Sequence, residues 1–314
     1  MDETFHKYIK IKQLGDLDNK DIFLDPEDTI VLEEKLDGAN SRFMIHKDGY
    51  ILFGSHNNEL PETEYSNKSW ARFINFVLNK INNETILKNP KYQRKIFYGE
   101  CMIKHSLSYD WEHIEPFLGF DIMDLDSGKY LENKNEIFNE LGLPVVPHLK
   151  VINAKEFQSF TDEDVPISKY APLDNKLQKA EGVVFKNYSK QIFAKYVRSE
   201  FKEINKSAFG LKKAYTRNDD ELIVSTYCTN ARIDKCVFKL SDDGYKIDRN
   251  LMKYLPVMVY KDIFEENYKD IFLTKYKLDL GNIKNLVAKR CLSVLDQIIT
   301  NNMLLSKLSN NDKI

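Results

Sequence analysis

The chain has 314 residues, of which 42% are hydrophobic and 30% are charged. This length and composition fit two soluble domains better than one. No apolar run approaches the roughly 18 residues that cross a bilayer, and the N-terminus lacks the basic start and apolar stretch of a secretion signal. We therefore expect a cytoplasmic protein, or one in the host cytoplasm if the chain is viral. The net charge of −2 gives no overall attraction to nucleic acid, so any polyanion site must come from local clusters.

The four cysteines lie far apart and form no C-x-x-C pair, which fits neither a zinc site nor a small disulfide framework. We expect reduced thiols. They are Cys101, Cys228, Cys236 and Cys291.

The first two-thirds of the chain predict an α+β body dominated by antiparallel strands. Asp48-Gly49 is a hairpin signal. Apolar residues at helical spacing predict an amphipathic helix over 69–82, and Gly142 followed by Pro144 closes a helix over 134–141. The expected strands are 29–36, 41–46, 50–54, 95–102, 117–123, 181–186 and 192–197.

From about residue 202 the pattern changes. Long periodic stretches at 219–240, 247–270 and 282–307 show little strand alternation. They predict a small, mostly helical C-terminal domain.

Lys35 stands at the end of a predicted strand, two residues before the Asp37-Gly38 turn. A free lysine amine has a pKa near 10.4 and must lose its proton to act as a nucleophile, which a desolvating pocket or neighbouring cations favour. The alternative is a solvated lysine beside a hairpin, and K-x-D-G alone is too short to exclude it.

Four further runs follow in order. Each also has a structural interpretation: Phe120 as a core residue, Glu181 as a turn residue and Lys195 as an edge lysine that keeps its charge in solvent. The runs are Phe97-Tyr-Gly-Glu100, Gly119-Phe-Asp-Ile122, Glu181-Gly-Val-Val-Phe-Lys186 and Phe193-Ala-Lys-Tyr-Val-Arg198.

Together with Lys35-Leu-Asp-Gly38, these runs resemble the ordered motifs of the covalent nucleotidyltransferase superfamily, which comprises polynucleotide ligases and mRNA capping enzymes. The resemblance covers about residues 30–205. E-K-x-x-G-x-N, G-F-D-I and K-Y-V-R-S-E-F-K-E are most similar to the ATP-dependent RNA ligases typified by the second RNA ligase of bacteriophage T4. This resemblance implies a nucleotidyltransferase (adenylylation) domain at 1–205 and a helical C-terminal domain at 206–314 that binds nucleic acid.

The resemblance also implies the chemistry. A lysine attacks ATP to form lysyl-AMP, the AMP passes to a 5′-phosphate, and a 3′-OH then seals the RNA strand with the help of Mg²⁺ or Mn²⁺. Lys35 is the implied nucleophile, and Glu181 is the implied metal ligand. In the remaining implied roles, main-chain atoms of Glu34 contact adenine, Asn40 binds phosphate, Glu100 takes the ribose hydroxyls, Phe120 stacks on adenine, and Lys195 binds the α-phosphate and lowers the pKa of Lys35.

Two positions depart from the family pattern. His56 stands where the family usually has an arginine that contacts ribose or phosphate, and Val197 replaces the second lysine of the last motif. Arg198 or Lys186 is a candidate replacement for that charge, although arginine and lysine differ in reach and geometry. We count His56 and Lys186 among the expected nucleotide-binding residues.

The expected function is an ATP-dependent RNA ligase that joins 3′-OH and 5′-phosphate ends, acts in RNA repair as a monomer, and has nicked duplex or broken RNA as its partner. A capping-type guanylyltransferase or a DNA ligase is one alternative, but Asn40 stands where both usually carry arginine and no OB-fold pattern follows residue 205. A catalytically degenerate nucleic-acid-binding protein is another. Basic patches in the C-terminal domain are candidates for phosphate contact or are solvated helix faces. They are Lys212-Lys213, Lys275–Lys277 and Lys284–Arg290.

Overall fold

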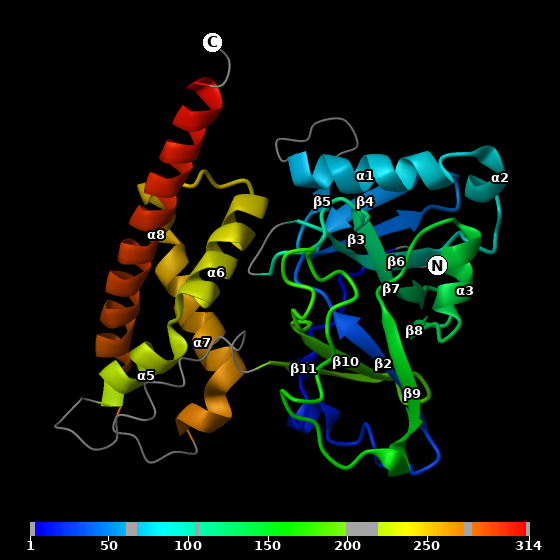
Figure 1. The fold of residues 1–314 in the computed structure, drawn as a ribbon, viewed down its shortest axis with the longest axis horizontal. Helices are drawn as coiled ribbons and strands as arrows, with labels where there is room; N and C mark the ends of the chain where they lie inside the picture. Colours follow the sequence, from blue (N-terminus) through cyan, green and yellow to red (C-terminus); the bar gives the residue numbers. More distant parts are fainter. Residues whose placement is uncertain (1–3, 61–67, 104–106, 199–218, 273–277, 312–314) are drawn as a thin grey trace. The chain divides into compact units, whose positions relative to one another are not determined.

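The computed structural model describes residues 4–60, 68–103, 107–198, 219–272 and 278–311 (Figure 1). The chain divides into two compact units, Met1–Arg198 and Ser199–Ile314. The expected boundary at residue 205 falls in 199–218, outside the described residues. The first unit is α+β and the second is helical in its described part, in agreement with the expected fold class.

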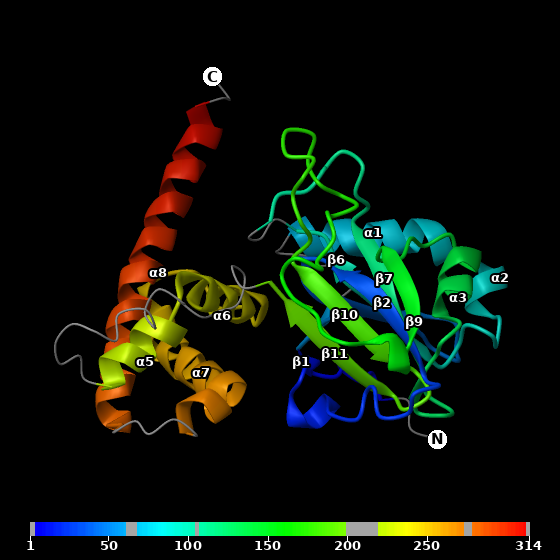
Figure 2. The same ribbon diagram turned by 60° about the horizontal axis from the view of Figure 1, so that its bottom comes forward.

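The first unit contains a five-stranded sheet in the order β1-β11-β10-β2-β9 (Figure 2). All neighbouring strands are antiparallel except β1 and β11. The register places Lys35 opposite Gly182, and Glu33 opposite Val184, which in turn faces Lys195. Residues directly opposite share a face and residues alternate along a strand, so Glu33, Lys35 and Lys195 all lie on one face. The strands are β1 (Lys12–Gln13), β2 (Thr29–Lys35), β9 (His148–Asn153), β10 (Gly182–Asn187) and β11 (Ile192–Val197).

The second sheet is antiparallel, with six strands in the order β5-β4-β3-β6-β7-β8. The predicted hairpin joins β3 to β4, and Gly49 takes a positive φ of 83° in its turn. The strands are β3 (Ala39–Ile45), β4 (Ile51–Ser55), β5 (Glu59–Leu60), β6 (Lys95–Cys101), β7 (Phe117–Asp124) and β8 (Lys129–Tyr130).

Helix α1 (Lys68–Ile81) covers one face of this sheet, as Figure 1 shows. Its Phe73 ring packs against Phe53 of β4 and Phe117 of β7. The apolar spacing that predicted this helix is therefore the stripe that it buries. Two shorter helices are α2 (Glu84–Leu87) and α3 (Lys134–Glu140). The chain turns after α3 at Gly142, whose φ is +65°, as expected for a helix C-terminus.

The two sheets pack against each other through a mixed apolar and aromatic layer. Met44, Ile96 and Tyr98 of the six-stranded sheet pack with Phe193 of the five-stranded sheet and with Tyr8 from the N-terminal segment. A separate cluster, which includes Leu32, Phe185 and Ala194, fills the opposite face of the five-stranded sheet. The face of the five-stranded sheet that carries Lys35 therefore packs toward the six-stranded sheet.

The second unit is an α-helical bundle around one apolar core. The periodic stretch over 219–240 contains two helices, because the chain leaves helical geometry before Thr229, whose hydroxyl caps the second one. The stretch over 247–270 begins as a 3₁₀ turn, η3 (Arg249–Lys253), before the α-helix starts. The α-helices are α5 (Asp219–Tyr227), α6 (Asn230–Asp242), α7 (Leu255–Phe272) and α8 (Leu280–Asn311).

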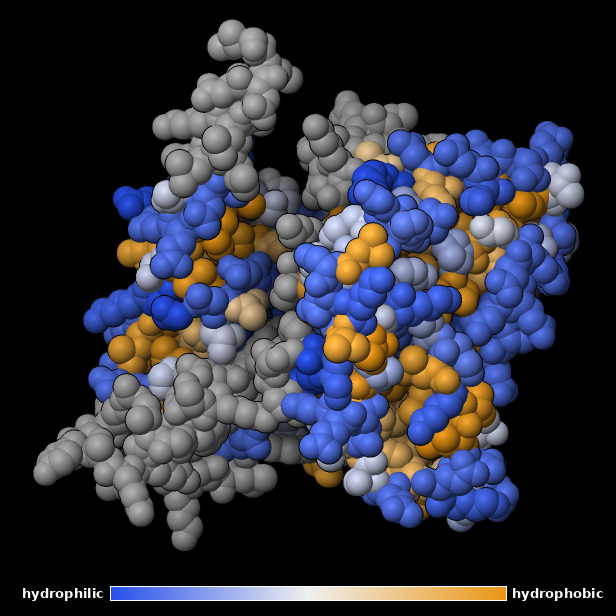
Figure 3. Space-filling view, in the orientation of Figure 1, coloured by the Kyte–Doolittle hydropathy of each residue, from blue (hydrophilic) through white to orange (hydrophobic). Residues whose placement is uncertain are grey.

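No helix in the described ranges is both long enough and apolar enough to cross a membrane. In the view of Figure 3, hydrophilic side chains cover much of the first unit, with smaller hydrophobic patches between them.

Candidate active site

Lys35 is the last residue of β2, and its amine meets a carboxylate. Lys35 Nζ lies 2.6 Å from Glu181 Oε2, and the two side chains are 25% and 13% exposed. Glu181 directly precedes β10, whose first residue pairs with Lys35. Two segments 146 residues apart therefore bring the predicted nucleophile and the predicted metal ligand together.

Glu100 and Asn40 face each other on β6 and β3, beside the turn that follows Lys35. Glu100 Oε1 accepts a hydrogen bond of 3.0 Å from the Gly38 N–H. A Cβ at residue 38 would lie 2.6 Å from the Cys101 carbonyl oxygen, so this close approach requires glycine. The side-chain oxygen of Asn40 is buried and has no hydrogen-bond partner among the described residues, which leaves an acceptor position for a ligand or water.

The same turn is fixed by residues that the sequence pattern did not reveal. Tyr109 accepts a 2.7 Å hydrogen bond from the Asp37 N–H through its hydroxyl, and the Leu107 N–H donates to Asp37 Oδ2 at 2.8 Å. These contacts join positions about 70 residues apart, so no local motif could have indicated them.

The ionisation of Lys35 differs from the expectation. Burial lowers the pKa of Lys35, but Glu181 and Glu100 raise it by more, so that it lies above the ordinary lysine value. The net shift is thus upward, although a cation at Lys195 was expected to lower the pKa, because the charges that dominate it are those of carboxylates. Lys195 does act on the site through Glu181, whose pKa it lowers.

The two carboxylates themselves hold protons more tightly than usual. Burial raises the pKa of Glu100 to about 8, and Glu181 raises it as well, whereas Lys35 lowers it. Burial and Asp37 also raise the pKa of Glu181 above its ordinary value, against the effects of Lys35 and Lys195. The site is therefore a group of closely spaced acids around one amine, and an added cation would reduce the repulsion between their negative charges.

The described residues include no cluster of three or more His, Cys, Asp and Glu side chains that could hold a metal by itself. Mg²⁺ is commonly bound by one or two carboxylates together with substrate phosphates. Glu181 and Glu100 supply hard oxygen donors of that kind, so the residues fit a divalent ion that arrives with a nucleotide.

Phe120 lies on β7 at a β-bulge. Tyr98 pairs with Asp121 and Gly99 pairs with Gly119, which makes Phe120 the extra residue. A bulge changes the direction of side chains and allows neighbours to share a face. The Phe120 ring accordingly packs into the layer between the sheets, with its centroid 4.8 Å from that of Tyr8.

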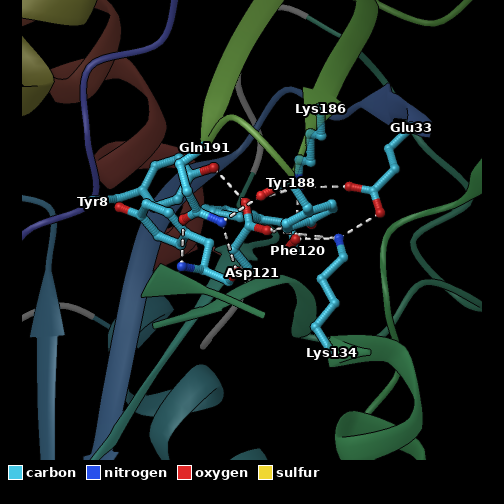
Figure 4. A network of polar contacts seen from close by, with 9 residues as sticks. Tyr8, Glu33, Phe120, Asp121, Lys134, Lys186, Tyr188 and Gln191 are labelled. Atoms are coloured by element: carbon cyan, nitrogen blue, oxygen red, sulfur yellow. Dashed lines mark hydrogen bonds and ion pairs between the residues drawn. The ribbon is translucent and has the colours of Figure 1, made fainter. Parts of the chain in front are cut away.

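Lys186 was expected to bind the nucleotide, but its ammonium group is buried between two carboxylates. It is 1% exposed, and its Nζ lies 2.7 Å from Glu33 Oε2 and 2.8 Å from Asp121 Oδ2. Lys134 of α3 completes a buried network with these residues (Figure 4). Sequence reasoning assigned no role to Glu33, Asp121 or Lys134, because single charged residues are usually solvated.

The other predicted residues take varied positions. The Glu34 side chain lies on the face opposite Lys35 and accepts hydrogen bonds from the Ser168 hydroxyl at 2.5 Å and the Lys169 N–H at 3.1 Å, so only its main chain is available for the expected role. The His56 carbonyl accepts a 3.0 Å hydrogen bond from Arg42. Arg198 donates to the carbonyls of Ala180 and Lys179 at 2.7 and 3.1 Å. It therefore supports the segment before Glu181, and its guanidinium is directed at main-chain oxygens.

A family model described as RNA ligase matches residues 28–202, which is more than half of the chain. The chain belongs to the RNA ligase family. The match contains Lys35, Glu100, Phe120, Glu181 and Lys195, so these residues lie in the family's own domain. The comparison with curated proteins gave no match.

Among solved structures, similar ones include Naegleria gruberi RNA ligase. A variant with ATP and Mn has 21% sequence identity and a TM-score of 0.46, and the match covers 63% of this chain and 58% of that one. The same ligase with PPi has 23% identity and a TM-score of 0.47, over 63% of this chain and 57% of that one. The chain described here thus covers less than two-thirds of the length of either Naegleria structure.

Proposed function

We propose that the chain is an ATP-dependent RNA ligase that joins 3′-OH and 5′-phosphate RNA ends through a Lys35–AMP intermediate. The observation that carries the proposal is the contact of 2.6 Å between Lys35 and Glu181 beside Glu100, inside the matched family domain. The Naegleria gruberi RNA ligase structures with ATP and Mn, and with AMP and Mn, support ATP as the substrate and a divalent ion as the cofactor.

In the first step, the neutral Lys35 amine attacks the α-phosphorus of ATP. A P–N bond forms, the P–O bond to pyrophosphate breaks, and a proton leaves the amine. Glu181 is the acceptor nearest to that proton, at 2.6 Å. Because Glu181 and Glu100 raise the pKa of Lys35, a cation that offset part of their charge would make the amine easier to deprotonate.

In the second step, an oxygen of the RNA 5′-phosphate attacks the AMP phosphorus and Lys35 leaves. In the third, the 3′-OH attacks the adenylylated 5′-phosphate, forms the phosphodiester bond and releases AMP. A bound Mg²⁺ or Mn²⁺ would withdraw charge from the phosphate oxygens, and Glu181, with Glu100 beside it, would hold it. Asn40 would bind phosphate, Phe120 would stack on adenine, Glu100 would accept hydrogen bonds from the ribose hydroxyls, and Lys195 would bind the α-phosphate.

The RNA ligase family match favours this function over the capping enzyme and DNA ligase alternatives. The closer resemblance to the branch typified by the T4 enzyme stays a prediction. RNA as partner, the monomeric state and the cytoplasmic location are likewise part of the proposal.

We also propose that the helical unit binds RNA. Of its three basic patches, Lys212-Lys213 and Lys275–Lys277 lie outside the described residues. In the third, Lys284 Nζ lies 5.2 Å from the centroid of the Tyr260 ring, and Arg290 donates to Asn230 Oδ1 at 2.5 Å.

The test uses the purified chain with α-labelled ATP and either Mg²⁺ or Mn²⁺. We expect a labelled protein adduct that is acid-labile and alkali-stable, absent in Lys35→Ala and present in Lys91→Ala, whose lysine is paired with Glu140 on the surface. A labelled Lys35→Ala variant would exclude Lys35 as the nucleophile. RNA binding with no adduct under either metal would favour the degenerate binding protein. Nicked substrates with RNA or DNA on each side then identify the substrate.

A further inference from the structure

The acid that precedes Lys35 by two residues on the same face of β2 is buried between two lysines. Glu33 is 1% exposed. Its Oε1 lies 2.5 Å from Lys134 Nζ, and its Oε2 lies 2.7 Å from Lys186 Nζ. Burial raises the pKa of Glu33, but the two ammonium groups lower it by more, so that the carboxyl stays ionised.

Both ammonium groups also reach the main chain of the other sheet. Lys186 Nζ donates to the Phe120 carbonyl at 2.6 Å, and Lys134 Nζ donates to the same oxygen. Figure 4 shows the two lysines converging on Phe120 from β10 and from α3. Glu33 of one sheet and Phe120 of the other are thus connected by two parallel bridges.

A second carboxylate, that of Asp121, contacts Lys186 and completes a cluster with Glu33 and Lys134. Its Oδ1 accepts a 2.6 Å hydrogen bond from the Tyr188 hydroxyl, and its Oδ2 accepts one from the Tyr8 hydroxyl. Glu33 and Asp121 balance the charges of Lys134 and Lys186. With all four side chains at most 2% exposed, each group has partners and little freedom to move.

Such a cluster is a poor source of stability. Desolvation of buried ions offsets much of their attraction, and apolar residues of similar size often give equal or greater stability. What the two bridges provide is a fixed spacing between β2, which ends in Lys35, and the bulge that carries Phe120.

We propose that Lys134 and Glu33 are positioning residues of the adenylylation site, which fix the Phe120 ring relative to the Lys35 amine. The inference rests on the proposed function, in which Phe120 stacks on adenine while Lys35 attacks the α-phosphorus. Lys134 touches neither reacting group; it acts through the Phe120 carbonyl and through Glu33. Its loss should therefore affect recognition of the base more than recognition of the phosphates.

The experiment compares wild type with Lys134→Met, Lys134→Arg and Lys91→Met. Lys91 pairs with Glu140 of the same helix α3 but lies on the surface, which makes it a matched control. Two affinities are measured: that for ATP, and that for inorganic tripolyphosphate, a probe without a base. The rate of adduct formation at saturating ATP is measured beside them.

We expect Lys134→Met to weaken ATP binding and slow the adduct by about tenfold each, as for a small misplacement of reacting groups. Tripolyphosphate affinity should stay within about twofold of wild type, Lys134→Arg should recover part of the loss because it keeps the charge, and Lys91→Met should match wild type. If Lys134→Met is unfolded at the assay temperature, Glu33→Gln gives the same comparison.

Parallel losses of ATP and tripolyphosphate affinity, or no loss in a folded Lys134→Met, would overturn the inference while the proposed function stands. A wild-type chain that forms no adduct overturns the proposed function, and with it this inference.

Discussion

Lys35 Nζ and Glu181 Oε2 lie 2.6 Å apart, so the predicted nucleophile forms an ion pair with a carboxylate. This contact favours the protonated form of the Lys35 amine. An ammonium has no lone pair, so the amine can attack only after it has lost its proton.

The first prediction concerns the pH dependence of adduct formation. Burial lowers the pKa of Lys35, but Glu181 and Glu100 raise it above the ordinary value, so the rate should increase with pH well into the alkaline range. Glu181→Gln removes one of the two charges and should move the inflection to lower pH by about one unit, even where the maximal rate falls. The pH profile of kcat/KM for ATP measures this, because it reports the pKa of groups in the chain before ATP binds, with exposed Glu140→Gln as the control. An inflection that stays in place in Glu181→Gln would contradict the assignment.

The second prediction concerns stability. Burial raises the pKa of Glu100 to about 8 in the folded chain, whereas an unfolded glutamate titrates near 4.3. The folded state therefore binds the proton more tightly, and the free energy of unfolding decreases as pH rises from about 4.3 to 8. The glutamine of Glu100→Gln cannot ionise, so the free energy of unfolding of this variant should rise relative to wild type by about 1–3 kcal/mol between pH 5 and 8.5. This gain is smaller than the pKa difference alone would give, because the side chain is partly exposed and solvent screens its charge.

Chemical denaturation at both pH values measures this gain. Glu140→Gln is the comparison, because Lys91 lowers the pKa of that exposed carboxyl and the opposite sign applies. A gain that is the same at both pH values would show that the carboxyl ionises normally.

The third prediction concerns Gly182, opposite Lys35. A Cβ built there would lie 1.9 Å from the Tyr196 carbonyl oxygen of β11, a distance that only a backbone shift could relieve. Gly182→Ala should destabilise the first unit by about 2–4 kcal/mol and abolish the adduct, because β10 positions Glu181. Thermal unfolding and adduct formation measure both effects. In Gly281→Ala the added Cβ meets only the Asp279 carboxylate, at 3.2 Å, so wild-type behaviour is expected there. An unchanged melting temperature in Gly182→Ala would mean that the strands are not so closely paired.

Local signals were sufficient for much of the fold. Asp48-Gly49 identified the β3–β4 hairpin, and the apolar spacing of residues 69–82 identified α1 within one residue at each end. Strand β9 was not predicted, because it lies at the edge of its sheet with mostly exposed or half-buried side chains and so has no clear alternation. The break before Thr229 was not predicted, although threonine is a common N-cap residue and its side chain accepts a hydrogen bond from the Arg232 N–H.

The candidate site was predictable where a motif carries the residue and unpredictable where a distant partner defines it. Lys35 and Glu181 were expected to act together, and they are in contact. Lys134 meets Glu33 across 101 residues, and nothing in either local sequence indicates a buried ion. Lys186 was assigned to the nucleotide for its charge alone, whereas Glu33 and Asp121 already use that charge.

The fourth prediction concerns the helical unit, where a buried ion pair joins α6 to α7. The Arg232 guanidinium is 1% exposed, contacts Asp262 Oδ2 and donates to the Tyr227 carbonyl at 2.9 Å. Asp262→Ala removes the nearest carboxylate and leaves the cation buried, which should cost about 3 kcal/mol, with Glu266 at 3.8 Å too far to replace it fully.

The double variant Arg232→Met, Asp262→Leu should cost less than Asp262→Ala alone, because apolar residues carry no desolvation penalty. Chemical denaturation of the wild type and the two variants gives the three free energies of unfolding. A double variant that is less stable than Asp262→Ala would mean that the pair itself stabilises the bundle. The Lys35 adduct should form at the wild-type rate in all of them, since the residues proposed for the first step belong to the other unit.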